Sequence, residues 1–195
     1  SNWWENSSDT GVDFVAQHQP DNVDFATTHI WPWNWYWYPE RTADPGDNMT
    51  DMYARCTQFL QDHIDAARGL GKPLVLEEFG LLRDGDHDNA TDGDGSEGPG
   101  TPVLERNTLF EMYYDMLFAD ADNGGPSAGS NFWTYNGDPP QEPESMYSVY
   151  PGDGTTLTII SEHAADMRTL VPEPATLLLV LPAATGLLLS RRRKR

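Results

Sequence analysis

The stretch K-P-L-V-L-E-E-F-G at residues 72–80 decides the fold class of this 195-residue chain. Residues 73–79 form a short and nearly continuous apolar run, which is typical of a strand buried on both faces in a parallel sheet. Residues 23–29 and 128–135 are rich in β-branched and aromatic side chains, so they predict two further strands, one earlier and one later in the chain.

A helix is predicted after each strand. Residues 50–68 repeat apolar side chains at a helical period, and glycines and a proline follow as stop signals. Thr101 and Pro102 predict the N-cap and first residue of a second helix, and residues 156–170 predict a third. The side chains expected to face the core are Met52, Cys56, Phe59, Leu60, Ile64 and Ala67, then Leu109, Met112, Tyr113, Met116 and Leu117, then Leu157, Ile160, Ala164 and Met167.

The alternation of strand and helix indicates an α/β fold with parallel strands. Three such units are too few to close a (β/α)8 barrel, which needs eight. An open doubly wound sheet is the alternative, although no glycine-rich phosphate loop joins a strand to a helix. Polar, aromatic and acidic residues gather directly after the strands, which is where a barrel keeps its active site.

The composition narrows the range of partners. The chain holds 12 basic and 31 acidic residues, for a formal net charge of −19. Nucleic-acid binding needs a basic face, so we expect no nucleic-acid partner and a neutral substrate instead. The single cysteine excludes a disulfide framework and a multi-cysteine metal site, and we expect neither a metal nor a cofactor at the functional site.

Two acids end the second predicted strand. Because side chains alternate along a strand, Leu76 and Glu78 are expected on one face and Val75 and Glu77 on the other, so only one acid should point into the site. A carboxylate at a strand end can act as the nucleophile in retaining glycoside hydrolysis. Spacing alone favours a solvated acid, which is common in a chain this acidic.

An aromatic stretch follows the first predicted strand. The sequence H-I-W-P-W-N-W-Y-W-Y at residues 29–38 holds four of the seven tryptophans. Aromatic faces suit the C–H faces of sugar rings, so we expect Trp31 and Trp35, together with Trp133 after the third strand, to bind a carbohydrate. His29 is expected to hydrogen-bond a sugar hydroxyl or to orient a carboxylate. Packing in the core is the alternative for each of these side chains.

Several of these segments together resemble a known family. D-F-A-T-T-H-I-W-P-W-N-W, K-P-L-V-L-E-E-F-G and G-S-N-F-W-T-Y, in this order, resemble strands 6, 7 and 8 of glycoside hydrolase family 5, most closely its endo-β-1,4-mannanases. The resemblance implies that residues 1–170 form the C-terminal part of a (β/α)8 TIM barrel and that the protein cleaves β-1,4-mannosidic bonds in neutral mannan with retention.

By the pattern of that family, Glu78 is the catalytic nucleophile, His29 and Trp31 lie beside the cleaved sugar, and Trp133 floors the site. The family's second carboxylate, a Glu in an Asn-Glu-Pro type motif after strand 4, has no counterpart in this sequence. We therefore expect this chain to be the C-terminal part of a mannanase with negligible activity alone. A β-1,4-glucanase of the same family and a non-catalytic carbohydrate-binding protein of the cell surface are the alternatives.

Residues 171–195 form a second segment. V-P-E-P at residues 171–174, an apolar run at residues 175–189 and R-R-R-K-R at residues 191–195 resemble a PEP-CTERM sorting tail, with Pro172, Glu173 and Pro174 as the sorting motif. The resemblance implies a secreted or cell-surface protein, anchored in the membrane by a short hydrophobic helix until exosortase-type machinery processes it. An ordinary C-terminal membrane anchor is the alternative.

An acidic, glycine-rich loop at residues 83–100 follows the second strand. Its Asp-x-Asp-x-Asp pattern suggests calcium, but Asn89 and Gly95 stand where an EF-hand loop needs Gly and Glu. We expect a solvated loop and leave calcium as the alternative.

Overall fold

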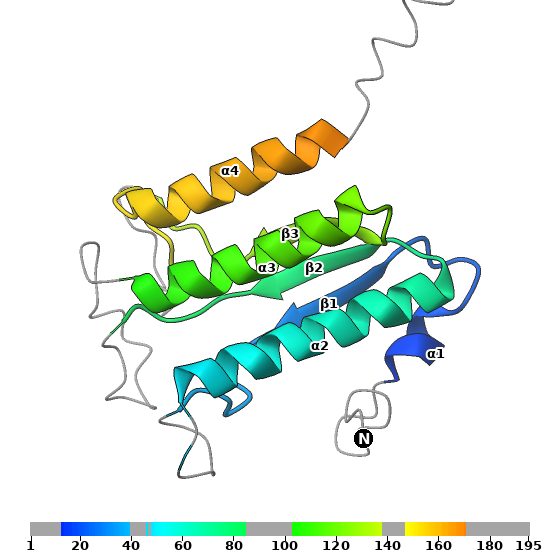
Figure 1. Cartoon of the computed structure of the whole chain (residues 1–195), viewed down its shortest axis with the longest axis horizontal. Coiled ribbons are helices and arrows are strands. Elements are labelled where there is room, and N and C mark those ends of the chain that lie inside the picture. The colour runs from blue at the N-terminus through cyan, green and yellow to red at the C-terminus, as the bar shows by residue number, and fades with distance from the viewer. Residues whose placement is uncertain (1–12, 40–45, 47, 85–102, 138–146, 171–195) are drawn as a thin grey trace, which may run out of the picture.

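Three strands and four helices make up the part of the chain that the computed structural model describes, residues 13–39, 46, 48–84, 103–137 and 147–170 (Figure 1). Strand and helix alternate as predicted. In chain order, the elements are α1 (Phe14–His18), β1 (Ala26–Ile30), α2 (Met49–Leu70), β2 (Leu74–Phe79), α3 (Leu104–Asp122), β3 (Ser127–Phe132) and α4 (Gly154–Leu170).

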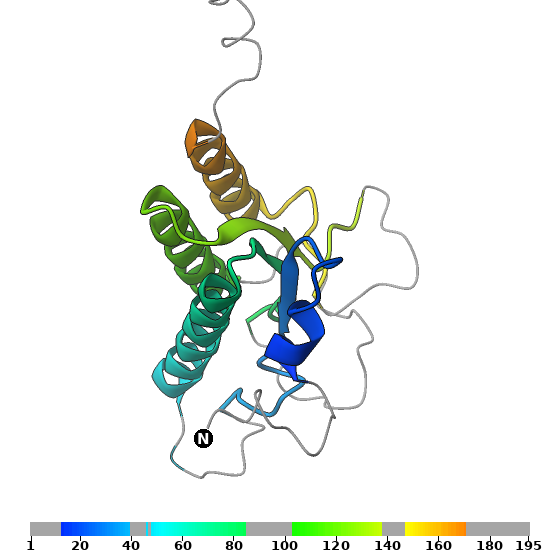
Figure 2. The same ribbon diagram turned by 90° about the vertical axis from the view of Figure 1, so that its right-hand side faces the viewer.

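The strands form one parallel sheet in the order β1-β2-β3. Helices α2 and α3 lie along one face of this sheet, and α4 packs against α3 (Figure 2). Because all three strands run in the same direction, their carboxyl ends meet at one edge, and the loops that follow them are brought together there.

Local sequence sets both ends of α2. The Asn48 side chain accepts a hydrogen bond from the N–H of Thr50 (2.9 Å), while the Asp51 carboxylate accepts one from the N–H of Asn48 (2.9 Å), which makes a capping box. Gly71 ends the helix with φ of 66°, a left-handed conformation that glycine adopts without steric cost. All six side chains of α2 that were predicted to face the core are buried.

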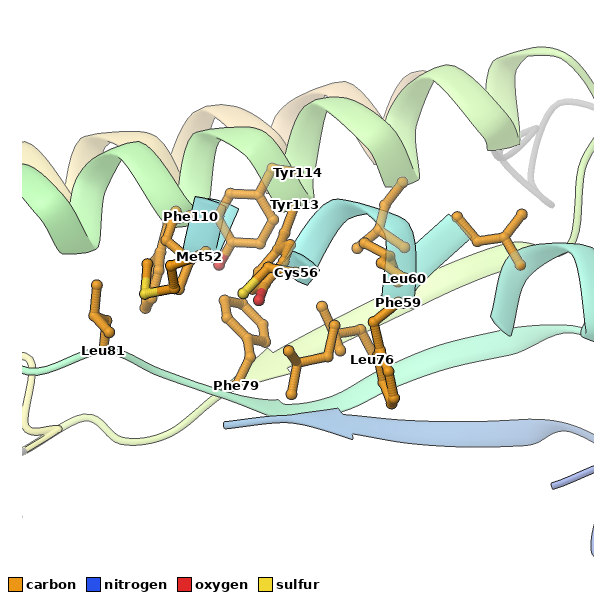
Figure 3. Packing of buried hydrophobic residues seen from close by; sticks show 14 of the residues in the cluster. Met52, Cys56, Phe59, Leu60, Leu76, Phe79, Leu81, Phe110, Tyr113 and Tyr114 are labelled. Atoms are coloured by element: carbon orange, nitrogen blue, oxygen red, sulfur yellow. The ribbon is translucent and has the colours of Figure 1, made fainter. Parts of the chain in front are cut away.

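The core lies between β2 and the helices α2 and α3 (Figure 3). Phe79 packs edge-on against the rings of Phe110 and Tyr113, with centroids 4.9 and 5.4 Å apart. Cys56 is fully buried beside them, as predicted. Burial raises the pKa of its thiol to about 12, so this cysteine stays protonated and has no thiolate character.

Helix α3 is capped from a distance. Val103 occupies the N-cap position without a side-chain hydrogen bond, and the carboxylate of Asp84 accepts bonds from the N–H groups of the next two residues, at 2.6 and 3.0 Å. The prediction that Thr101 caps this helix, with Pro102 as its first residue, is therefore wrong, because an acid from the loop after β2 satisfies the free N–H groups. Both predicted residues lie outside the described ranges.

Two predicted core faces are only partly buried. In α3, Met112 and Met116 are partly exposed, while Phe110 and Tyr114 are buried in addition to the predicted residues. In α4, all four predicted side chains are partly exposed. The reason is that α4 packs against α3 and leaves an open groove of about 440 Å³ between its inner face and β3.

Some predictions concern parts of the chain that the structure does not describe. The sorting motif Pro172, Glu173 and Pro174, the apolar run at residues 175–189 and most of the acidic loop, residues 85–100, lie outside the described ranges. Among the helices of the described ranges, none is long and apolar enough to cross a membrane.

Candidate functional site

The predicted site residues of the three strands meet at the carboxyl edge of the sheet. His29 near the end of β1 and Glu78 near the end of β2 are partners in the parallel register. Trp133 directly follows β3, and its N–H donates a hydrogen bond to the carbonyl oxygen of Phe79 at the end of β2 (2.8 Å). Segments about 50 residues apart in the sequence are thus joined by backbone pairing.

A β-bulge in β2 turns both acids away from the core. In the pairing with β1, the register goes from Leu76 directly to Glu78, so Glu77 has no partner residue. In the pairing with β3, two residues lie between Leu76 and Phe79, whereas only one residue lies between their partners in β3. Leu76 and Phe79 are both fully buried despite this odd spacing. The side chains of Glu77 and Glu78 are instead 48% and 33% exposed. The prediction that only one acid faces the site is therefore wrong, because strict alternation does not allow for a bulge.

The imidazole of His29 contacts both carboxylates. Its Nε2 lies 3.3 Å from Oε2 of Glu77, and its Nδ1 lies 3.4 Å from Oε2 of Glu78. The His29 side chain is 42% exposed, so solvent or a ligand can reach it. These contacts are the ones that the predicted carboxylate-orienting role requires.

Gly80 lets three aromatic residues close around the end of β2. A Cβ at this position would lie 2.6 Å from the carbonyl oxygen of Trp133 and 3.2 Å from the rings of both Trp31 and Tyr147. The rings of Trp31 and Tyr147 contact one another, with centroids 4.7 Å apart, and the Tyr147 hydroxyl donates a hydrogen bond to the Asn34 side chain. Trp133 is 47% exposed, so part of its surface is open to a ligand.

Replacing Gly80 with alanine is expected to destabilise the protein by about 1–3 kcal/mol, because the added methyl group forces backbone or rings to move in a filled space. The free energy of unfolding, measured by urea denaturation followed through tryptophan fluorescence, tests this. Gly69→Ala is the control, since a Cβ there meets nothing within 4 Å and the helix gains up to about 1 kcal/mol. Equal stability of the Gly80→Ala variant and the wild type would contradict the expectation.

The remaining tryptophans of the aromatic stretch pack against the body of the protein. Trp33 is buried against Tyr38, with ring centroids 5.1 Å apart. Trp35 contacts Trp37 (5.0 Å) and Phe59 of α2 (5.1 Å). These contacts support a packing role for Trp35, and its predicted contact with substrate stays a prediction.

A buried ion cluster ties together the loops that follow β2 and β3. Arg83 makes two hydrogen bonds of 2.7 Å to the carboxylate of Asp153, and both side chains are at most 3% exposed. Arg106 of α3 donates to the carbonyl oxygens of Leu81 (2.8 Å) and Ser148 (3.0 Å). The cluster therefore fixes the loop next to Glu78 against the segment that carries Tyr147.

Burial and neighbouring charges shift the pKa values of Asp153 and Arg106 in this cluster. Burial raises the pKa of Asp153, but the hydrogen bonds from Arg83 and from the N–H of Tyr150, with the charges of Arg83 and Arg106, lower it below its ordinary value. Burial and the neighbouring charge of Arg83 lower the pKa of Arg106 to about 10. At neutral pH the carboxylate of Asp153 is therefore ionised and Arg106 is protonated, and both arginines surround this one carboxylate.

Metal binding has no support in the described part of the chain, where no group of three or more His, Cys, Asp and Glu side chains is arranged to hold an ion.

Sequence analysis missed Glu77 as a residue that faces the site, and it missed Tyr147 and Gly80. A glycine directly after the end of a strand was the available signal for Gly80. No local signal marked Tyr147, because its contact with Trp31 joins segments more than 100 residues apart.

Comparison with known sequences gives a consistent result. Residues 3–137 match the model of a family described as GH family 5 beta-mannosidase-like. A putative mannan endo-1,4-beta-mannosidase 4 of Arabidopsis thaliana is 32% identical over 162 residues, which are 82% of this chain and 35% of that protein. A mannan endo-1,4-beta-mannosidase 4 of Solanum lycopersicum is 32% identical over 66% of this chain and 27% of its own length. The chain thus spans about a third of the length of these relatives.

Solved structures agree. A glycoside hydrolase family 5 mannosidase from Rhizomucor miehei superposes with a TM-score of 0.66 at 31% identity, over 83% of this chain and 42% of that one. An endo-beta-1,4-mannanase from Thermotoga petrophila, at 23% identity and a TM-score of 0.55, supports the fold. The parallel sheet and its helices are part of a TIM-barrel α/β fold, as predicted. This chain belongs to glycoside hydrolase family 5, in its β-mannosidase-like group.

Proposed function

We propose that this chain carries the nucleophile half of a retaining glycoside hydrolase that cleaves β-1,4-mannosidic bonds in mannan. One observation carries the proposal: the accessible carboxylate of Glu78 lies at the carboxyl end of β2, in contact with His29. The relatives named as mannan endo-1,4-beta-mannosidases support mannan as the substrate.

The reaction assigns each side chain a task. The ionised carboxylate of Glu78 attacks the anomeric carbon, and the bond to the glycosidic oxygen breaks as that oxygen takes a proton from an acid. Water then hydrolyses the glycosyl ester and regenerates the carboxylate. Trp133 offers an exposed indole face to a sugar ring, and Trp31, held beside Tyr147, lies next to the strand end that carries Glu78.

The second carboxylate is the part that this chain does not supply. A retaining enzyme needs a proton donor about 5–5.5 Å from the nucleophile, and the sequence has no Asn-Glu-Pro motif to provide it. Loss of general acid–base catalysis lowers rates by about 10²–10⁴-fold. We therefore propose that these 195 residues alone bind mannan without hydrolysing it at a useful rate.

Gel retardation and product analysis test the proposal together. The chain is expected to be retarded by soluble β-1,4-mannan and to release no more reducing sugar than its Glu78→Gln variant. Trp133→Ala should weaken the retardation about 5- to 10-fold, because it removes a stacking face of the kind worth about 1 kcal/mol. Phe25→Ala is the matched control, since Phe25 is 51% exposed but precedes β1 at the opposite edge of the sheet. Retardation by carboxymethylcellulose instead of mannan would point to a glucanase, and retardation by neither would contradict the proposal.

The C-terminal segment is proposed to act in sorting. The order of Pro172-Glu173-Pro174, an apolar run and a basic end in residues 171–195 supports recognition by exosortase-type machinery and a secreted or cell-surface location. This proposal rests on the sequence of the tail.

A further inference from the structure

Glu77 has no task in the proposed reaction, yet it is in direct contact with the site. Its Oε2 is 3.3 Å from Nε2 of His29, in a contact with hydrogen-bond geometry. The register pairs between β1 and β2 skip Glu77, so the bulge lies at this residue. A bulge breaks the ladder of backbone hydrogen bonds locally and re-aims side chains, which makes it an unusual place for an acid that is merely solvated.

The histidine has one ring nitrogen for each acid. Nε2 faces Glu77, and Nδ1 faces Glu78 at 3.4 Å. A neutral imidazole carries one N–H and one lone pair, whereas an ionised carboxylate can only accept. The two carboxylates therefore compete for the single ring proton, and the acid that receives it holds the ring in place by a charge-assisted bond.

We propose that Glu77 is a positioning residue that accepts the Nε2 proton of His29 and thereby holds the imidazole against Glu78. The geometry favours this arrangement, because the contact to Glu77 has the better hydrogen-bond geometry of the two. Glu77 also forms no covalent bond in the proposed reaction, while Glu78 loses its charge when it forms the glycosyl ester. The ring thus has a constant anchor while its other neighbour changes. Only this last consequence rests on the proposed function.

The position of the ring proton gives a direct test that needs no substrate. Nitrogen–proton correlation spectra of the 195-residue chain, recorded at a pH where the His29 ring shows a single N–H, distinguish a proton on Nε2 from one on Nδ1. In the wild type, His29 is expected to carry its proton on Nε2. Glu77→Gln should shift the ratio of the two tautomers at least about threefold toward Nδ1, because a charge-assisted acceptor becomes a neutral one. Glu78→Gln should shift the ratio in the opposite direction.

Glu111→Gln is the matched control, since it removes the same charge from an exposed position on α3. Backbone amide spectra confirm that each variant is folded. An unchanged tautomer ratio in Glu77→Gln, or shifts of the same sign in the Glu77 and Glu78 variants, would overturn the proposal. Either result leaves the assignment of Glu78 as nucleophile intact, whereas failure to bind mannan contradicts the proposed function and not the positioning.

Discussion

Treatment of the chain with 2-deoxy-2-fluoro-β-mannosyl fluoride is expected to attach one fluoromannosyl group to Glu78 and to no other residue. Fluoride leaves without a proton, so the missing acid is not needed for this step. The fluorine at C2 disfavours the positive charge that develops in both steps, and the ester accumulates instead of being hydrolysed. Intact mass followed by peptide mapping measures the adduct and locates it.

The adjacent acid provides the control for this experiment. Glu78→Gln removes the attacking oxygen and should reduce labelling to background. Glu77→Gln should keep the adduct on Glu78, although both acids contact the same imidazole. Fluoromannosyl ester on Glu77, or equal labelling of the wild type and the Glu78 variant, would refute the assignment of the nucleophile.

The parts of this fold that depend on neighbours in sequence could be predicted. Helix α2 shows its core face as a regular repeat from Met52 to Ala67, and its ends are set by Asn48 and Gly71 within one turn of the helix. Strand β2 was predicted within one residue, because a buried strand between turn signals has a distinct composition. The position of the candidate site at one edge of the sheet could be predicted from these elements, since parallel strands bring their carboxyl ends together.

The features that depend on distant contacts could not be predicted. The bulge at Glu77 appears in the pairing of β2 with both neighbouring strands. The sequence of β2 alone does not mark it, and strict alternation of side chains was therefore assumed. Asp84 caps a helix that begins 20 residues later, and it displaced the prediction of a local cap at Thr101. Tyr147 reaches Trp31 only because the chain returns to the site after β3. Each of these depends on tertiary structure that a local pattern does not contain.

Asp153→Asn is expected to destabilise the protein by about 3–5 kcal/mol, the largest effect on stability that we anticipate. Among the described residues, Asp153 makes a salt bridge to both buried arginines, with two bonds of 2.7 Å to Arg83 and a 3.6 Å contact to Arg106. Without its charge, both buried guanidinium groups lose this ionic partner, and Arg106 already has one buried nitrogen, Nη2, without a hydrogen-bond partner among the described residues. Urea denaturation gives the free energy of unfolding. Asp166→Asn on the exposed face of α4 is the control and should change it by less than about 0.5 kcal/mol.

The same carboxylate gives the protein a defined response to acid. The pKa of Asp153 is lower in the folded protein than the value of about 3.9 expected in the unfolded chain, so its contribution is fully present above that value and is lost as the pH falls through the folded pKa. The wild type should therefore lose stability more steeply than Asp153→Asn does as the pH falls from about 5 through the folded pKa. Parallel slopes for the two proteins would show that Asp153 binds protons equally in both states. Because the cluster joins the loop after Glu78 to the segment of Tyr147, wild-type binding of mannan should weaken over the same pH range in which this stability is lost.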